Sequence, residues 1–439
     1  MGIPLVSALA LAAVVAPQAA VRVRVEGRVQ DAPVEMYVAW AVAGELGGTG
    51  EAEALRAMAV VARTWARTNM GRHRSEGFDF CQTTHCQRLD PGAVSERVRR
   101  AVEDTDGMVL WHQGRPADVF HSGDCGGRTA SAGELWPGMA RSYLPSKEDP
   151  FCSRGGPFAW RAVLRWDQLE LALGRRGLRH LTVSARSGSG RVLRLDSNRG
   201  PVDAGELHVR VGRTLGWNLL RSRVYSVEPT PEGAVFSGKG AGHGAGLCQK
   251  GAVEMAKSGA NFREILAFYF PGTKAGVNAQ GLAWRRLGGE LTEVWTLEGG
   301  APVSASAADA AWREARRRSG LDAACRPRVR EYPDTALFRD STGASGAVAA
   351  VTRGCTIHVH RTARLAAQGE LVQVLLHEMM HVLIDANRRA PLPEWFEEGL
   401  AEFLAGGVRR AAERARVEAL IRRYGREAVL RFLETGLPE

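Results

Sequence analysis

Residues 377–402 read H-E-M-M-H-V-L-I-D-A-N-R-R-A-P-L-P-E-W-F-E-E-G-L-A-E, and this stretch decides the fold of the last part of the chain. His377 and His381 are four residues apart, so on a helix they share one face and can bind one metal ion. Glu378 lies beside them and is suited to act as a general base on water in metal-assisted hydrolysis. Apolar residues at helical spacing predict that helix: Leu371, Val374, Leu375, Val382 and Leu383.

A second helix is predicted directly after the first. Pro393 is well placed to open it, and Glu398 and Glu402 are four residues apart along it. A catalytic zinc site needs three protein ligands and one open position for water, so a glutamate from this helix would complete the site. The alternative reading of H-E-x-x-H is an amphipathic helix that carries two solvated histidines.

This stretch resembles the gluzincin metallopeptidases, in which the glutamate of an E-G-x-A-type segment completes the zinc site. That glutamate matches Glu398 here, and Glu402 is then expected to orient a ligand rather than bind the metal. The resemblance covers about the last hundred residues. It implies Zn²⁺ bound by His377, His381 and Glu398, with Glu378 as a catalytic residue acting on an unknown protein or peptide substrate.

Composition narrows the class of protein. A chain of 439 residues is long enough for two or three domains, and 45% hydrophobic residues argue against disorder. The net charge of +10 favours an anionic partner such as a cell-wall polymer or a membrane surface, and a general bias toward arginine is the alternative. The chain lacks a dense Lys/Arg run with interleaved aromatic residues, so nucleic acid is not an expected partner.

The N-terminus predicts export. Residues 3–20 form an apolar run that ends in small residues, which is typical of a signal peptide occupying residues 1–20. An uncleaved anchor is the alternative, but Pro17 and the shortness of the run argue against it. We therefore expect a protein of the periplasm or cell envelope. Export permits disulfides, and among the seven cysteines Cys325 and Cys355 are a candidate pair.

The next segments place a glutamate between two elements. Val21 to Gln30 alternates as a strand does, whereas Met36 to Ala43 is apolar enough for a buried strand or helix. Glu51 to Met70 has an apolar stripe at helical spacing. Glu45 lies in front of the glycine-rich bend 47–50 that leads into this helix, and the alternative role for it is a solvated turn residue.

Cys81, His85 and Cys86 lie close together in F-D-F-C-Q-T-T-H-C-Q and are soft metal ligands. Three ligands are one short of a closed zinc site, and their spacing is not that of a zinc finger. A disulfide or a pair of free thiols is the alternative. Further on, the apolar pattern of residues 109–117 predicts a hairpin with Gly114 in its turn.

Two loops have the composition of binding segments. In D-V-F-H-S-G-D-C-G-G-R-T-A a strand delivers His121 and Ser122 to a glycine-flanked loop, where binding or catalytic groups are common. In F-S-G-K-G-A-G-H-G-A-G-L-C-Q the glycines let backbone approach a ligand closely around His243. This second segment has the spacing of neither glycine-rich nucleotide-binding loop.

Taken in order, several blocks resemble the SpoIID/LytB family of stage II sporulation protein D and the amidase enhancers. The blocks are E-A-L-R-A-M-A-V-V-A-R-T-W-A, T-H-C-Q, F-H-S-G-D-C-G-G-R-T, G-A-G-H-G-A-G-L-C-Q-K-G-A-V-E-M-A and I-L-A-F-Y-F-P-G-T. The resemblance covers roughly residues 30–275. It implies peptidoglycan binding and, as in stage II sporulation protein D, lytic transglycosylase action on glycan strands stripped of their peptides.

The resemblance also implies roles for single residues. Glu45 matches the catalytic acid, which protonates the leaving oxygen of a glycosidic bond. Cys81, His85 and Cys86 match a segment that binds a metal in some members, so a second Zn²⁺ is expected there. The candidate substrate-binding residues are Arg63, His121, Ser122, His243 and Gln249.

Three functions follow from these observations. The favoured one is an exported wall-remodelling enzyme with a glycan-acting domain and a zinc-peptidase-like domain. The second is a non-catalytic module that binds peptidoglycan and recruits or stimulates an N-acetylmuramoyl amidase. The third is a hydrolase in which Cys125 or Cys248 is the nucleophile, activated by His121 or His243.

The expected fold class is α+β. A mixed SpoIID-like domain with antiparallel strands and helices is predicted for residues 21–275, followed by a linker at 276–300. A smaller, mainly helical zinc-peptidase-like domain is predicted for 301–439. Its first helix is expected at Ser306 to Arg317, with Ser306 and Asp309 spaced as a capping box. Its other elements are expected as an edge strand at Thr356 to His360 and closing helices from Ala411 to Leu433.

Overall fold

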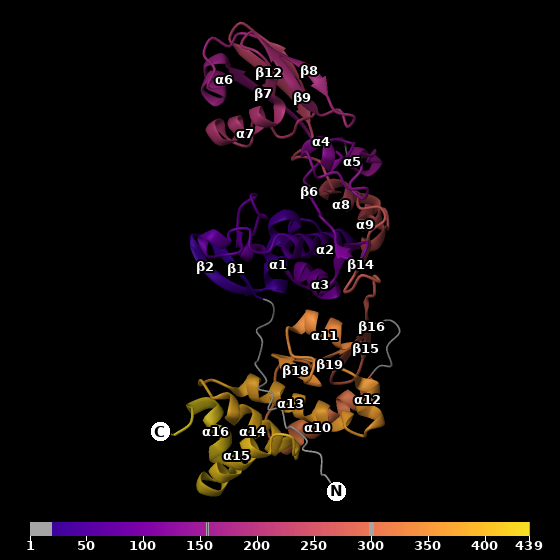
Figure 1. Cartoon of the computed structure of the whole chain (residues 1–439), viewed down its shortest axis with the longest axis vertical. Helices are drawn as coiled ribbons and strands as arrows, with labels where there is room; N and C mark the ends of the chain where they lie inside the picture. Colours follow the sequence, from indigo (N-terminus) through magenta and orange to yellow (C-terminus); the bar gives the residue numbers. More distant parts are fainter. Residues whose placement is uncertain (1–19, 155, 157, 298–302, 439) are drawn as a thin grey trace, which may run out of the picture. The chain divides into compact units, whose positions relative to one another are not determined.

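The computed structural model describes residues 20–154, 156, 158–297 and 303–438. The chain divides into two compact units, Val21–Gly281 and Leu282–Glu439 (Figure 1). Apart from Ala20, the predicted signal peptide lies outside the described residues. Within the described ranges, none of the helices combines the length and the apolar character needed to cross a bilayer.

The N-terminal unit opens with a hairpin where the alternating pattern predicted one strand. Its strands are β1 (Ala20–Val25) and β2 (Arg28–Pro33). The chain reverses at Glu26 and Gly27, which have positive φ angles of 49° and 81°. A third strand, β3 (Phe80–Cys81), pairs parallel with β1 and completes the sheet β2-β1-β3. This pairing brings the first cysteine of the T-H-C-Q region to the end of a strand.

Two packed helices follow the hairpin. The apolar run that fitted a strand or a helix is helical and lies in α1 (Val34–Leu46), whose residues 37–43 are all buried. A helix that is apolar on every side belongs in a core, which is why its sequence lacked a helical period. Helix α2 (Ala52–Thr68) packs on α1 and confirms the helix predicted for Glu51 to Met70. Glu45 therefore lies in the last turn of α1.

Short elements connect distant segments around these helices. Strands β6 (His121–Ser122) and β13 (Leu247–Cys248) pair in parallel, and α8 (Gln249–Lys257) begins directly after β13. The hairpin predicted around Gly114 is confirmed and forms part of the sheet β14-β4-β5. The other elements of this part are α3 (Glu96–Asp104), β4 (Val109–His112), β5 (Arg115–Pro116), α4 (Ala132–Leu135), α5 (Pro150–Arg154), α9 (Phe262–Tyr269) and β14 (Lys274–Gly276).

Residues 159–239 form a further part of this unit with its own core. Two antiparallel sheets, β11-β12-β7 and β10-β9-β8, pack with helices around Trp160, Leu195 and Phe236 (Figure 1). This arrangement confirms the predicted mixture of antiparallel strands and helices. The elements are β7 (Ala159–Arg165), α6 (Trp166–Leu173), β8 (Leu181–Arg186), β9 (Val192–Ser197), β10 (Val202–Asp203), α7 (Ala204–Leu215), β11 (Tyr225–Pro229) and β12 (Gly233–Lys239).

The C-terminal unit contains a five-stranded sheet in the order β15-β16-β17-β19-β18, with helices packed against it. The three inner strands run parallel, whereas the two edge strands are antiparallel to their neighbours. The core joins side chains of the sheet, such as Val294 and Ile357, to the helical Leu375. The elements are β15 (Trp284–Gly288), β16 (Glu293–Leu297), α10 (Ala305–Ser319), β17 (Arg328–Tyr332), α11 (Thr335–Thr342), β18 (Ala350–Arg353), β19 (Thr356–His360), α12 (Thr362–Ala367), α13 (Leu371–Asn387), α14 (Glu394–Ala405), α15 (Ala411–Tyr424) and α16 (Arg426–Thr435).

This sheet corrects three predictions. The segment expected as a linker supplies β15 and β16, so the unit is a mixed α and β layer structure rather than a mainly helical one. Thr356 to His360 is an inner strand between β17 and β18, not an edge strand. Charged residues concealed the sheet in the sequence: Glu293 is buried within β16 because it forms an ion pair with Arg286 on β15.

The start of α10 also differs from the predicted capping box. Ser304, not Ser306, is the N-cap and accepts a hydrogen bond from the backbone N–H of Ala307. Asp309 instead accepts hydrogen bonds from the loop between β15 and β16. The predicted pairing of Cys325 with Cys355 is confirmed, since the two form a disulfide.

Candidate functional site

Glu45 reaches its position because a loop packs closely on the end of α1. The backbone N–H of Asp90 donates to the carbonyl oxygen of Trp40 at 3.0 Å. A Cβ atom at Gly44 would lie 2.3 Å from the carbonyl oxygen of Arg88, so only glycine allows this approach. The backbone N–H of Arg88 then donates to Glu45 Oε1 at 3.3 Å. One carboxylate oxygen is thereby held by the loop.

The second carboxylate oxygen is held by residues from two other segments. The pairing of β6 with β13 places His121 opposite Leu247, so Gln249 at the start of α8 lies beside His121. Gln249 Nε2 donates to Glu45 Oε2 at 2.7 Å and lies 3.3 Å from His121 Nδ1. His121 Nδ1 is itself 3.9 Å from Glu45 Oε2. The structure thus brings together Glu45, His121 and Gln249, as predicted.

The electrostatics of this group favour a neutral imidazole beside the carboxyl group. Burial lowers the pKa of His121, and the charge of Glu45 opposes that shift only in part. The side chains of Glu45 and His121 are 15% and 14% exposed. Glu45 is therefore a carboxyl group that two N–H donors fix in place and that stays partly exposed.

Two further predicted residues lie near this group. Ser122 follows His121 on β6, is buried, and its Oγ has no hydrogen-bond partner among the described residues. His243 Nδ1 accepts a hydrogen bond from the backbone N–H of Ala245 at 3.0 Å, and its ring packs edge-on against Trp136. Burial, with the charge of Arg191 as a smaller cause, lowers the pKa of His243 to about 3.

Arg63, by contrast, does not join Glu45. Its guanidinium forms a bidentate ion pair with Glu35, with N–O distances of 2.8 and 2.6 Å, and also donates to the carbonyl oxygen of Met108. Its side chain is only 4% exposed. The prediction that Arg63 binds substrate is therefore corrected: this arginine ties α2 to α1, since Glu35 lies in the first turn of α1.

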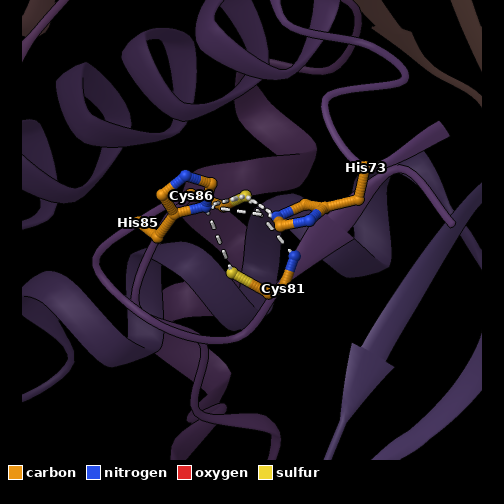
Figure 2. Close-up of side chains that lie close together, drawn as sticks. All are labelled: His73, Cys81, His85 and Cys86. Atoms are coloured by element: carbon orange, nitrogen blue, oxygen red, sulfur yellow. Dashed lines mark hydrogen bonds between the residues drawn. The ribbon is translucent and has the colours of Figure 1, made fainter. Parts of the chain in front are cut away.

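A second group combines the predicted Cys81, His85 and Cys86 with His73, for which no role was predicted (Figure 2). His73 Nε2 lies 3.2 Å from His85 Nδ1 and 3.4 Å from Cys86 Sγ. Cys81 Sγ lies 3.9 Å from His85 Nδ1. Zinc bonds of about 2.3 Å to sulfur and 2.0 Å to nitrogen would separate tetrahedral ligand atoms by roughly 3.3–3.8 Å. The four residues therefore fit one zinc ion.

The charges in this group also suit a cation. Hydrogen bonds from Thr83 and His85 outweigh burial and lower the pKa of Cys81 to about 6, which favours the metal-binding thiolate. Burial raises the pKa of Cys86 to about 12. His73 Nδ1 is bonded to Glu76 Oε1 at 2.5 Å, which leaves Nε2 to face the other ligands. The sequence did hold one signal for His73, because the three predicted ligands are one short of a closed zinc site.

The third group contains the H-E-x-x-H motif in the C-terminal unit. His377 and His381 share one face of α13, with 3.1 Å between their Nε2 atoms. Glu398 on α14 places Oε2 at 3.7 Å from His377 Nε2 and Oε1 at 3.6 Å from His381 Nε2. Glu402 Oε2 lies 2.9 Å from His377 Nδ1, on the opposite side of the ring. The helices bring the predicted residues together, and their roles as zinc ligands stay a prediction.

Charge and access fit a divalent cation here as well. The carboxylates of Glu398 and Glu402 outweigh burial and raise the pKa of His377 to about 10. Hydrogen bonding to His377 outweighs burial of Glu398 and lowers its pKa to about 2. A metal ion bound between these side chains would balance the negative charge of the two carboxylates. A cavity of about 1190 Å³ opens over these side chains.

Glu378 is positioned by Thr352, for which no role was predicted. Its side chain is buried, and its Oε2 accepts a hydrogen bond from Thr352 Oγ1 at 2.7 Å. Thr352 belongs to the edge strand β18, which lines the same cavity. No sequence signal links the two, because the strand and the helix meet only in the folded unit.

The Cys/His hydrolase alternative requires its nucleophilic cysteine to be bonded to the activating histidine, and the described contacts do not include that pair. Cys125 and Cys248 are fully buried, and the backbone N–H of Cys125 donates to Cys248 Sγ at 3.3 Å. Among the described contacts, neither sulfur is bonded to His121 or His243. Hydrogen bonds to neighbouring cysteines, together with burial, raise the pKa of Cys125, which disfavours a nucleophilic thiolate.

Comparisons with known proteins support the resemblance to stage II sporulation protein D and the amidase enhancers. Residues 24–112 match the SpoIID family model, described as stage II sporulation protein. An uncharacterized protein of Brachyspira hyodysenteriae is 28% identical over 253 residues, covering 56% of this chain and 67% of that protein. The amidase enhancer of Bacillus subtilis is 25% identical over 297 residues, covering 55% of this chain and 39% of that protein.

Stage II sporulation protein D of Bacillus subtilis is 24% identical over 268 residues, which cover 56% of this chain and 75% of that protein. The gluzincin resemblance of the last part of the chain stays a prediction. Over somewhat more than half of its length, this chain is similar to stage II sporulation protein D and to an amidase enhancer.

Proposed function

We propose that the protein is exported to the cell envelope and that its N-terminal unit binds peptidoglycan glycan strands. In this proposal the unit cleaves these strands as a lytic transglycosylase, with Glu45 as the acid. The observation that carries this proposal is the fixed carboxyl group of Glu45, held by Gln249 and by the backbone of Arg88. The similarity to stage II sporulation protein D supports the choice of a glycan substrate.

In this mechanism Glu45 donates its proton to the oxygen that leaves the glycosidic bond. A hydroxyl group of the same sugar attacks the anomeric carbon and closes an anhydro ring, so no second carboxylate is needed. That hydroxyl group loses its proton to Glu45, which restores the acid for the next cycle. Burial lowers the pKa of His121, so this imidazole adds no positive charge next to Glu45.

The test is digestion of purified sacculi and of peptide-free glycan strands with the full chain and with Glu45→Gln. We expect Glu45→Gln to abolish release of soluble fragments while the protein keeps its far-UV circular dichroism and its binding to the glycan. The matched control is Glu51→Gln, because Glu51 lies at the N-cap of α2 and its side chain makes no capping bond. Equal release by wild type and Glu45→Gln would remove Glu45 from the mechanism.

The same digestion assay distinguishes glycan cleavage from a non-catalytic binding role. An amidase enhancer would bind the glycan, release nothing on its own, and speed an added N-acetylmuramoyl amidase. Wild-type protein that binds sacculi without turnover would favour that function over cleavage. The similarity to the amidase enhancer of Bacillus subtilis motivates this part of the test.

We propose, as a second function, that the C-terminal unit is a zinc metallopeptidase. The supporting observation is the convergence of His377, His381 and Glu398 within the large cavity of this unit. When bound there, zinc supplies a Lewis acid that polarises an amide carbonyl and water. In this proposal Glu378 would accept the proton of the attacking water and pass it to the leaving amine, and the hydrogen bond from Thr352 to its carboxylate supports that role.

Substitution of Glu378 tests this second function. We expect Glu378→Gln to retain zinc, measured by elemental analysis after gel filtration, and to lose at least about a hundredfold in peptide hydrolysis. Glu394→Gln is the matched control, since Glu394 lines the same cavity and, among the described ion pairs, forms none with His377 or His381. A native protein purified without chelators that holds no zinc in this unit would refute the proposal.

A further inference from the structure

Three cysteines from separate segments meet in the interior of the N-terminal unit. Cys125 lies on the loop after β6, Cys152 on α5, and Cys248 at the end of β13. The carboxylate of Asp149 joins them, and all four residues are at most 1% exposed. Their sulfur and carboxylate oxygen atoms lie within 4.8 Å of one another. These residues are distinct from the His73 group and from the Glu45 group.

The contacts of these atoms make one sulfur a hydrogen-bond acceptor and the other two thiol donors, whose protons a metal ion would displace. Cys248 Sγ accepts hydrogen bonds from the backbone N–H groups of Cys125, at 3.3 Å, and Gly251, at 3.4 Å. Asp149 Oδ2 accepts hydrogen bonds from the Cys125 thiol at 3.3 Å and from the Tyr269 hydroxyl at 2.8 Å. Zinc bonds of about 2.3 Å to sulfur and 2.1 Å to oxygen place ligand atoms roughly 3.5–3.8 Å apart, which is compatible with this cluster.

The surroundings hold compensating positive charge. Arg191 is 1% exposed and donates to the carbonyl oxygens of Cys125, at 3.0 Å, and His243, at 2.8 Å. A buried guanidinium needs an anionic neighbour, and a site of three thiolates and one carboxylate around a divalent cation has a net charge of about −2. Cys152 Sγ now donates to Asp124 Oδ1 at 3.1 Å, and this proton would be released on metal binding.

A disulfide accounts for this cluster less well. Three thiols allow only one disulfide and leave one thiol buried without a covalent or metal partner. The structure pairs Cys325 with Cys355 but leaves Cys125, Cys152 and Cys248 unpaired. A cavity of about 640 Å³ reaches Cys125 and offers an ion a path from solvent.

We propose that Cys125, Cys152, Cys248 and Asp149 bind a structural zinc ion. All four positions of a tetrahedral site are filled by protein, so the ion would have no open position for catalysis. Its role would be to fix the segments that hold the Glu45 group, because Cys248 precedes Gln249 directly and Cys125 lies on the loop that leaves His121. The proposal concerns metal binding and holds whether or not the unit cleaves glycan.

The test uses the full chain with the other two donor sets removed. Cys81→Ser with Cys86→Ser removes the two thiols of the His73 group, and His377→Ala with His381→Ala removes the ligands of the C-terminal group. Three cysteines then remain outside the Cys325–Cys355 disulfide. We expect this chain to purify with about one zinc ion, and Cys152→Ser in the same background to lose it.

Two further measurements test the proposal even if the Cys152→Ser chain does not fold. In the background with all three cysteines, replacement of zinc by Co²⁺ should produce the strong thiolate-to-cobalt absorption in the near ultraviolet. Thiol titration with Ellman's reagent in denaturant and chelator should find about three free thiols. Absence of zinc and of the cobalt absorption would overturn the proposal. A single free thiol would also overturn it, because the other two would then form a disulfide.

Discussion

At the scale of single residues, the geometry of Glu45 depends on the amide of Gln249. Gln249→Leu keeps the approximate volume but removes the N–H donor at 2.7 Å from Glu45 Oε2. We expect cleavage of glycan strands to fall roughly tenfold to hundredfold, because a misoriented acid loses part of its positioning advantage. The rate of fragment release, measured at saturating glycan, checks this. Gln280→Leu, at an exposed position, should leave the rate unchanged, and an equal loss there would contradict the account.

The residues of the candidate sites differed in how far they could be predicted. Gln249 belongs to a recognisable block, Glu45 lies shortly before one, and Glu398 lies on the helix that follows H-E-x-x-H. His73 and Thr352 were missed because their partners are brought to them only by folding. Arg63 also belongs to a recognisable block, but a buried ion pair with Glu35 determines its place. The sequence of a motif therefore identified residue types better than it identified their contacts.

At the scale of elements, Asp309 fastens α10 to the loop between β15 and β16. Burial acts to raise its pKa, but hydrogen bonds from the Thr292 hydroxyl and from three backbone N–H groups outweigh it and lower the pKa. A carboxyl group with a lowered folded-state pKa stabilises the fold above its unfolded pKa of about 3.9, and that stabilisation is lost as pH falls through the folded value.

Asp309→Asn should therefore be costly at neutral pH and less costly in acid. We expect about 1–3 kcal/mol loss in the free energy of unfolding at pH 7, shrinking below pH 4 as the wild-type carboxylate is protonated. Urea unfolding followed by circular dichroism at both pH values checks this. Asp322→Asn, at an exposed ion pair with Arg316, is the control and should change little. A cost that is the same at both pH values would contradict the assignment.

Elements with a clear period were predicted and those without one were not. Helices α2 and α13 carry apolar stripes, and their predictions are confirmed. Strands β15 and β17 carry arginines that pack over the rings of Trp284 and Trp295, so their sequences read as polar. Burial of a charged group with an aromatic or acidic partner is a tertiary effect, which the pattern of one segment does not contain.

At the scale of the whole molecule, the two units have separate cores and separate candidate sites. We therefore expect the two activities to be independent in the full chain. Glu378→Gln should leave glycan cleavage unchanged, and Glu45→Gln should leave peptide hydrolysis unchanged, each within about twofold. Assays of both activities on both variants check this, and a large loss in the unmutated unit would contradict it.

The measurement that tests the central claim most directly is mass spectrometry of the fragments that the full chain releases from peptide-free glycan strands. An acid that acts with the sugar's own hydroxyl predicts anhydro-ended products from the wild type and none from Glu45→Gln. Reducing-ended products, or anhydro-ended products that persist in Glu45→Gln, would contradict the account.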